Sequence, residues 1–204
     1  MAGLVDYPRR SRRGEPVWEL ATLYPEQGGW SEEEYLRLDT NRLVEYDNGV
    51  LEFLPMPKIS HQRIVRVLFL LLESLTKAHG GEVFTAPTRL KVSPRKYREP
   101  DLVYVLDASR AAGSDDYFQA ADLVMEVVSE GADSHERDYV KKRRNYAAAG
   151  IPEYWIVDPH MKRVTVLVLA RGKYAKHAEA GPGETAQSAM FKELRVRVSD
   201  LFGK

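Results

Sequence analysis

The carboxylate of Glu126 is the most informative group in the sequence, because it stands inside the apolar run Leu123–Val128. A strand that is apolar on both faces is usually buried in the centre of a sheet. A buried carboxylate loses its hydration, which is unfavourable by several kcal/mol unless a cation or donor compensates it. The sequence therefore predicts a cation beside Glu126. That cation is either a metal ion or, in the simpler alternative, an arginine at the end of the strand.

A second acid, Asp101, follows Pro100 and opens the apolar run Leu102–Val105. Taken alone, this aspartate is equally well explained as the cap of a turn. If its strand lies beside that of Glu126, the two carboxylates can bind one ion. Mg²⁺ typically takes one or two carboxylates together with water and phosphate oxygens. The pair therefore indicates a divalent metal site.

A lysine is expected to join these acids from the helix that follows the Glu126 strand. Asp138, Lys142 and Tyr146 are spaced four residues apart, so they share one stripe of that helix. The tyrosine favours a stripe that faces the sheet. Lys142 would then point toward the acids, whereas its neighbours in the basic run remain on the solvated face.

Composition places the chain among ordinary globular proteins. It has 204 residues, of which 44% are hydrophobic and 29% charged, as in a typical α/β domain. The absence of cysteine excludes disulfides, thiolate zinc sites and a cysteine nucleophile, and it agrees with a cytoplasmic location. No run approaches the roughly 20 apolar residues that cross a bilayer, so we expect no membrane partner.

The net charge is zero, which is unusual for a dedicated DNA-binding module. Arginines nevertheless cluster in residues 9–13, within a tail over residues 1–16 that we expect to be disordered. A second basic run comprises Lys141, Arg143 and Arg144 around Lys142. This run is either a solvated face or a surface that contacts the phosphates of a nucleic acid.

The surrounding patterns predict the elements that would position these residues. Ser31 and Glu34 have the spacing of a capping box. Asn48-Gly49 is a strong hairpin signal. Strands and helices alternate through residues 17–204 without a linker, which favours a single domain with a mixed sheet and helices packed on it. The predicted helices are 31–38, 60–80 and 133–150, and the predicted strands are 43–46, 50–54, 82–85, 88–92, 101–106, 123–128, 153–157 and 163–169. Residues 194–202 are predicted to add a weak strand and a terminal turn.

The ordered set of motifs over about residues 30–170 resembles the Uma-type restriction endonucleases of the PD-(D/E)XK nuclease superfamily. The resemblance implies an α/β (α+β) fold with a restriction-endonuclease-like core, a mixed β-sheet flanked by helices. It also implies a metal-dependent endonuclease that hydrolyses DNA. The motifs are residues 44–49, 60–62, 98–103, 123–129, Arg137-Asp138, Lys142, Tyr146, Gly150 and 153–159.

The resemblance also implies roles for individual residues. Asp101, Glu126 and the carbonyl of Val127 would bind Mg²⁺ or Mn²⁺, and Lys142 would orient the attacking water or contact the phosphate. The superfamily usually has its lysine two residues after the second acid, where this chain has Val128. Together with the zero net charge, this departure leaves an alternative open, in which the fold is an inactive module that binds nucleic acid or protein.

Two upstream residues match the family with less defined roles. Glu45 matches an additional acid near the metal, although it could equally be a polar residue on the face of a hairpin strand. His61 matches a recurrent histidine at a helix start. We place it with the basic residues as a nucleic-acid contact, and the alternative is that it only caps the helix. Restriction-type nucleases often dimerise, so by analogy a homodimer is expected.

Overall fold

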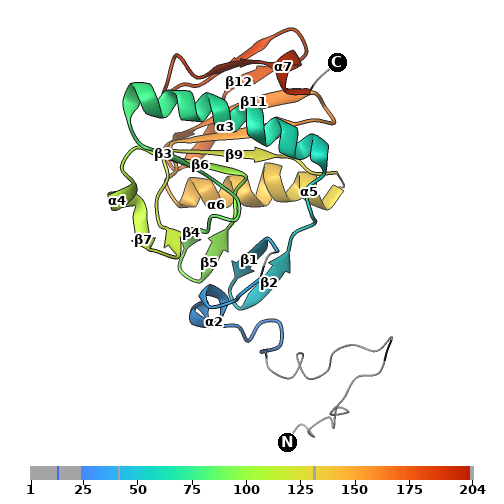
Figure 1. Cartoon of the computed structure of the whole chain (residues 1–204), viewed down its shortest axis with the longest axis vertical. Coiled ribbons are helices and arrows are strands. Elements are labelled where there is room, and N and C mark those ends of the chain that lie inside the picture. The colour runs from blue at the N-terminus through green and yellow to red at the C-terminus, as the bar shows by residue number, and fades with distance from the viewer. Residues whose placement is uncertain (1–12, 14–23, 41, 131, 203–204) are drawn as a thin grey trace, which may run out of the picture.

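The structure is a computed structural model that describes residues 13, 24–40, 42–130 and 132–202 (Figure 1). Of the predicted basic tail it describes Arg13 alone, so that prediction falls outside the described residues. The described part is built on two six-stranded sheets and a short two-stranded one. Each of the two large sheets supplies part of the candidate site.

The central sheet has the strand order β12-β11-β10-β9-β6-β3. β9 and β10 run parallel, and the other neighbours are antiparallel. Parallel neighbours need a crossover connection, which here is the helical segment between β9 and β10. The predicted mixed sheet is thus confirmed. Its strands are β3 (Glu82–Thr85), β6 (Leu102–Val105), β9 (Leu123–Val127), β10 (Glu153–Asp158), β11 (Arg163–Ala170) and β12 (Lys173–Ala180).

Strand β9 is buried on both faces, as its composition predicts. Met125 packs in the same cluster as helix α3 (Ile59–His79). Val124 and Val128 instead pack with Tyr146 of helix α6. Figure 1 shows α3 and α6 on opposite sides of β9. Because strand residues alternate between faces, Glu126 must point toward the α6 side of the sheet.

The crossover helix is one run with an irregular centre. It begins with α5 (Ala132–Glu136), continues as the π-helical segment η1 (Arg137–Lys142) and ends as α6 (Arg143–Ala148). Its start lies within two residues of the prediction, and it ends before Gly150, which has a positive φ of 77°. The π segment was not predicted. Such segments are rare and often stand at functional sites.

The second sheet, with strand order β2-β1-β5-β4-β8-β7, contains the predicted hairpin. Asn48 and Gly49 have φ values of 51° and 92°, which a type I′ turn requires. Helix α2 (Glu32–Leu36) has the predicted capping box between Ser31 and Glu34. The strands are β1 (Val44–Asp47), β2 (Val50–Phe53), β4 (Leu90–Ser93), β5 (Lys96–Arg98), β7 (Ala112–Ser114) and β8 (Tyr117–Phe118).

Several strands were missed by the sequence analysis, and each lacks the usual pattern. β5, β7 and β8 have three residues or fewer, which is too short for a periodicity. Residues 107–121, for which the sequence predicted no strand, contain β7 and β8 as well as the short helix α4 (Ala108–Ala111). β12 is an edge strand whose exposed side is polar, so apolar residues do not alternate along it.

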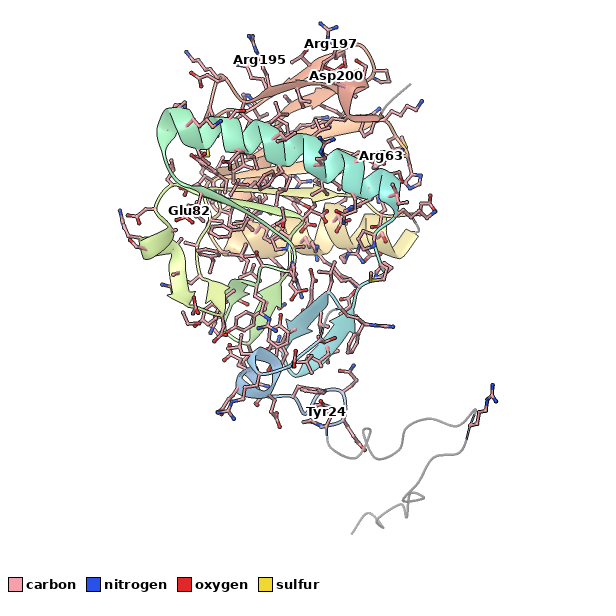
Figure 2. All side chains as sticks on the ribbon, in the orientation of Figure 1. Tyr24, Arg63, Glu82, Arg195, Arg197 and Asp200 are labelled. Atoms are coloured by element: carbon pink, nitrogen blue, oxygen red, sulfur yellow. The ribbon has the colours of Figure 1, made fainter. Side chains whose placement is uncertain are left out.

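The predicted C-terminal strand and turn correspond to β14 (Arg195–Arg197) and helix α7 (Val198–Phe202). β14 pairs with β13 (Thr185–Gln187), which was not predicted. Figure 2 shows Arg195 and Arg197 pointing outward, whereas Val196 between them is buried. In the part of the chain that the structure describes, no helix combines the length and apolarity needed to cross a membrane.

Candidate active site

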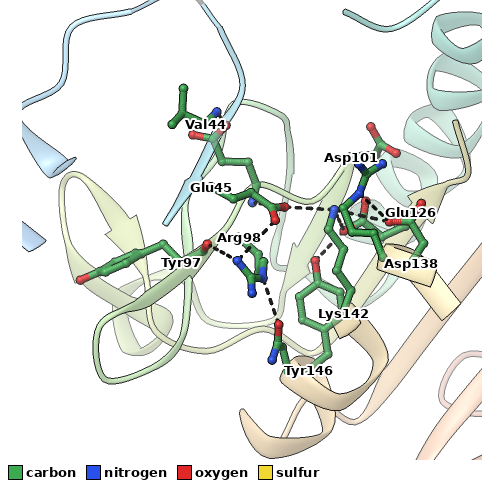
Figure 3. Close-up of polar contacts among 12 residues, drawn as sticks. Val44, Glu45, Tyr97, Arg98, Asp101, Glu126, Asp138, Lys142 and Tyr146 are labelled. Atoms are coloured by element: carbon green, nitrogen blue, oxygen red, sulfur yellow. Dashed lines mark hydrogen bonds and ion pairs between the residues drawn. The ribbon is translucent and has the colours of Figure 1, made fainter. Parts of the chain in front are cut away.

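The predicted acids and lysine meet at a small pocket between the two sheets and η1 (Figure 3). Its volume is about 30 Å³, enough for one or two groups the size of a water molecule. Its charged lining consists of Glu99, Asp101, Glu126, Asp138, Arg137 and Lys142. Four carboxyl groups therefore face two permanent cations.

Glu126 is 3% exposed and lies at the centre of this arrangement. Its Oε1 accepts hydrogen bonds from Lys142 Nζ at 2.8 Å and from the Tyr146 hydroxyl at 2.5 Å. Burial raises the pKa of Glu126 above its ordinary value, and Lys142 opposes that rise. The cation predicted beside this acid is thus a lysine, and the arginine alternative is wrong.

Lys142 is 2% exposed and surrounded by carboxylates. Its Nζ lies 3.1 Å from Glu45 Oε1 and 3.8 Å from Asp138 Oδ1, in addition to Glu126. Burial alone would lower the pKa of Lys142, but Glu126 and Glu45 outweigh it, so the pKa lies above its usual range. Lys142 is therefore held as a positive charge and a hydrogen-bond donor within the cluster.

The π segment explains why Asp138 and Lys142 both reach the pocket. A π turn contains more residues than an α turn, so residues four apart are roughly one turn apart along it. Tyr146, four residues further, lies in α6 and is fully buried. The predicted stripe thus faces the sheet, and the π segment aligns its first two members.

Asp101 connects the start of β6 to the end of β9. Its Oδ2 accepts a hydrogen bond from the backbone N–H of Val127 at 2.8 Å and lies 3.2 Å from His61 Nε2. These contacts reach another strand and helix α3, so the reading of Asp101 as a simple turn cap does not describe it. The carboxylate is held beside the carbonyl of Val127, as the expected metal site requires.

His61 comes from the first turn of α3 and is 8% exposed. Its Nε2 lies 3.0 Å from the carbonyl oxygen of Val127. Burial lowers the pKa of His61, but the hydrogen bond to Asp101 outweighs it, so the pKa lies above its ordinary value. His61 therefore contacts two of the groups expected to bind metal.

Glu45 reaches the pocket from β1 of the second sheet and is 1% exposed. Besides Lys142, its carboxylate contacts Arg98 Nη1 at 3.5 Å and accepts from the backbone N–H of Glu99 at 3.4 Å. Burial raises the pKa of Glu99 to about 7. Glu45 is thus a buried member of the cluster, and the alternative of a polar residue on a hairpin face is wrong.

Four residues of the cluster had no assigned role in the sequence analysis. Glu99 precedes Asp101 by two residues, and this spacing places both on one side of an extended chain. Tyr146 and Asp138 lie on the stripe of Lys142, which was the available signal for them. Arg137, whose Nε lies 3.3 Å from Asp138 Oδ1, was indicated only by the family motif Arg137-Asp138.

The remaining predicted nucleic-acid contacts lie elsewhere. Arg143 donates a hydrogen bond to the backbone carbonyl of Tyr174 at 2.8 Å. Arg143 and Arg144 line a separate pocket of about 480 Å³ between α6 and the start of β12, and Lys141 is exposed. Lys142 alone of the basic run turns into the cluster.

The pocket fits a divalent cation in charge and donor type. Its lining carries four carboxyl groups against two permanent cations, so it has acids to spare for a bound cation once they are ionised. Asp101 Oδ2 and the carbonyl of Val127 are oxygen donors, which Mg²⁺ and Mn²⁺ prefer. Among the described residues, however, no three histidine, aspartate or glutamate side chains form a metal-binding group. The ammonium of Lys142 lies among three acids, Glu126, Glu45 and Asp138.

Comparisons with known proteins agree with this arrangement. A protein family described as "Putative restriction endonuclease", Uma2, matches residues 32–199. The chain also resembles a solved structure entitled a "putative nuclease belonging to DUF820 from Anabaena variabilis ATCC 29413". The two are 21% identical with a TM-score of 0.67, over 87% of this chain and 98% of the other. No curated protein matches the chain.

The solved structure confirms the predicted restriction-endonuclease-like fold, and the family match covers the hairpin, β6, β9, the crossover helix and β10. These are the elements that build the pocket. The chain belongs to the Uma2 family of restriction-endonuclease-like proteins.

Proposed function

We propose that this protein is a metal-dependent endonuclease that hydrolyses phosphodiester bonds of DNA. The observation that carries the proposal is the convergence of Asp101, Glu126 and Lys142 at one buried pocket lined by more acids than cations. Strands and a helix far apart in the sequence supply these groups. A nuclease family and a fold shared with a nuclease support the same reaction.

In this proposal Asp101, Glu126 and the carbonyl of Val127 hold Mg²⁺ or Mn²⁺. When bound, such an ion activates water as a nucleophile and stabilises negative charge in the transition state. Lys142 holds Oε1 of Glu126 in place and, as a fixed cation, stabilises charge that develops on the phosphate. Glu45 fixes the other side of the Lys142 ammonium.

Lys141, Arg143 and Arg144 are proposed to contact phosphates away from the cleaved bond. The pocket beside Arg143 and Arg144 is also lined by Lys173 and by no acidic residue. Binding through such contacts would weaken steeply with salt. A homodimer and a cytoplasmic location remain predictions from the sequence.

The test is nicking of a supercoiled plasmid with Mg²⁺ or Mn²⁺. Asp101→Ala, Glu126→Ala and Lys142→Gln should each reduce cleavage at least about 100-fold, because each removes a group acting on the transition state. Glu179→Ala and Lys176→Ala, a surface acid and base that pair with each other, serve as matched controls and should cut as the wild type does. Equal cutting by all variants would mean that another protein in the sample is responsible.

One observation favours a second function, that of a module that binds nucleic acid without cutting it. Val128, at the superfamily's usual lysine position, is 3% exposed and packed into the core with Tyr146. A module that binds nucleic acid without cutting it would show affinity for DNA in the same experiment, unaffected by metal and with no nicking.

A further inference from the structure

His61 contacts two of the three groups that would bind the metal, the carbonyl of Val127 and the carboxylate of Asp101. Its Nε2 lies 3.0 Å from the carbonyl oxygen of Val127 and 3.2 Å from Oδ2 of Asp101. Asp101 Oδ2 in turn accepts the N–H of Val127. An imidazole nitrogen from α3, a carbonyl oxygen from β9 and a carboxylate oxygen from the start of β6 thus converge on one point.

A structural role does not account for this histidine. The N-cap of α3 is Lys58, with no side-chain hydrogen bond to the cap, so His61 does not cap its helix. Its other nitrogen, Nδ1, is buried and has no hydrogen-bond partner among the described residues. Buried polar atoms are nearly always paired, and an unpaired one needs an explanation. Within the described part of the chain, the polar contacts of this ring are the carbonyl of Val127 and the carboxylate of Asp101.

The distances match those between neighbouring ligands of one ion. With metal–ligand bonds of ~2.1 Å, adjacent corners of an octahedron stand roughly 3.0 Å apart. The two measured distances, 3.0 Å and 3.2 Å, have this length. In the structure Nε2 faces these two acceptors as a hydrogen-bond donor, and loss of that hydrogen, with the other on Nδ1, would leave the Nε2 lone pair available to an ion in its place.

We propose that His61 is a direct ligand of the metal, through Nε2, together with Asp101 Oδ2 and the carbonyl of Val127. This inference rests on the proposed function, since it concerns the same metal. It changes the role of His61 from a nucleic-acid contact to a part of the metal site.

A nitrogen donor also defines the class of ion. Mg²⁺ keeps to oxygen ligands, whereas imidazole suits the first-row transition metals. The site should therefore prefer a first-row transition-metal dication over Mg²⁺, and Mn²⁺, a member of that row that also takes oxygen ligands, serves as the paramagnetic probe. Replacing His61 should reduce the affinity for Mn²⁺ more than the affinity for Mg²⁺.

The experiment uses Mn²⁺ alone with the full chain and no nucleic acid. Pulsed electron paramagnetic resonance of bound Mn²⁺ detects the hyperfine coupling of a directly bound nitrogen, and titration gives the dissociation constants for Mn²⁺ and Mg²⁺. The variants are His61→Gln and His61→Ala, with His160→Gln as the matched control. His160 is an exposed histidine that lines the neighbouring pocket with His61.

We expect nitrogen coupling in the wild type and in His160→Gln, and its loss in both His61 variants. His61→Ala should bind Mn²⁺ at least about 10-fold more weakly, a loss typical of a disrupted metal site. If the wild type binds Mn²⁺ without nitrogen coupling, and Asp101→Ala loses that binding, the histidine is not a ligand. The proposed metal site would then still stand. No Mn²⁺ binding by the wild type would overturn both. The wild-type spectrum decides the question even where a His61 variant fails to fold.

Discussion

Replacing Lys142 by methionine is the sharpest test of the buried charge cluster. Methionine has a similar length and no charge, so the substitution mainly removes the ammonium. That ammonium lies 2.8 Å from Glu126, 3.1 Å from Glu45 and 3.8 Å from Asp138, and it is 2% exposed. Removing one partner of a buried ion pair destabilises a protein by about 3–5 kcal/mol. Since a typical domain has only about 5–15 kcal/mol of stability, this loss is large.

The loss should depend on pH with a definite sign. The attraction that the substitution removes exists only while the carboxylates are ionised. Burial already raises the pKa of Glu126 above its ordinary value of 4.5, and losing Lys142 raises it further. An acid with a raised pKa in the folded state destabilises the fold above that pKa, and the effect disappears as pH falls toward the unfolded value. The wild-type pKa of Glu126 is about 8, so the difference from wild type should open above that value and be larger near pH ~9.5 than near pH ~5.5.

The assay is urea unfolding of both proteins at the two pH values, with a chelator to remove divalent metals. A double variant, Lys142→Met with Glu126→Gln, removes both partners and should recover part of the lost stability, because replacing a whole buried pair is often nearly neutral. A loss below about 1 kcal/mol at the higher pH, the range of an exposed pair, would refute the buried arrangement.

Three other predictions concern separate parts of the structure. Tyr146→Phe removes a donor to a buried carboxylate and should lower the free energy of unfolding by about 1.5–3 kcal/mol, measured in urea; no change would show that the contact is not formed. Gly49→Ala should destabilise by more than Gly172→Ala in thermal melts, because both have positive φ but only a Cβ at Gly49 would meet a backbone oxygen, at 2.4 Å. Arg143→Ala and Arg144→Ala should each reduce DNA affinity and lower the slope of log affinity against log salt by about 1; an unchanged slope would exclude them as phosphate contacts.

The sequence by itself determined the central strand, its acid and the helix that carries the lysine. These follow from local rules: β9 is apolar on both faces, and Asp138, Lys142 and Tyr146 recur at helical spacing. The hairpin around Asn48 was equally local, since only residues that tolerate positive φ form that turn. Such patterns indicate which face of a helix or strand is buried. They therefore predict that Glu126 and Lys142 both point into the protein.

Only the tertiary structure decided what else reaches the pocket. Glu45 arrives because β1 pairs with β5, whose last residue, Arg98, stands three positions before Asp101. No local pattern encodes that pairing between distant segments. His61 likewise meets Val127 only because α3 packs on β9. Helices and strands are specified by residues that are neighbours in the chain. A site is specified by long-range packing, which brings together charged residues that are far apart in the sequence. Their spacing in the sequence has no periodicity that could reveal it.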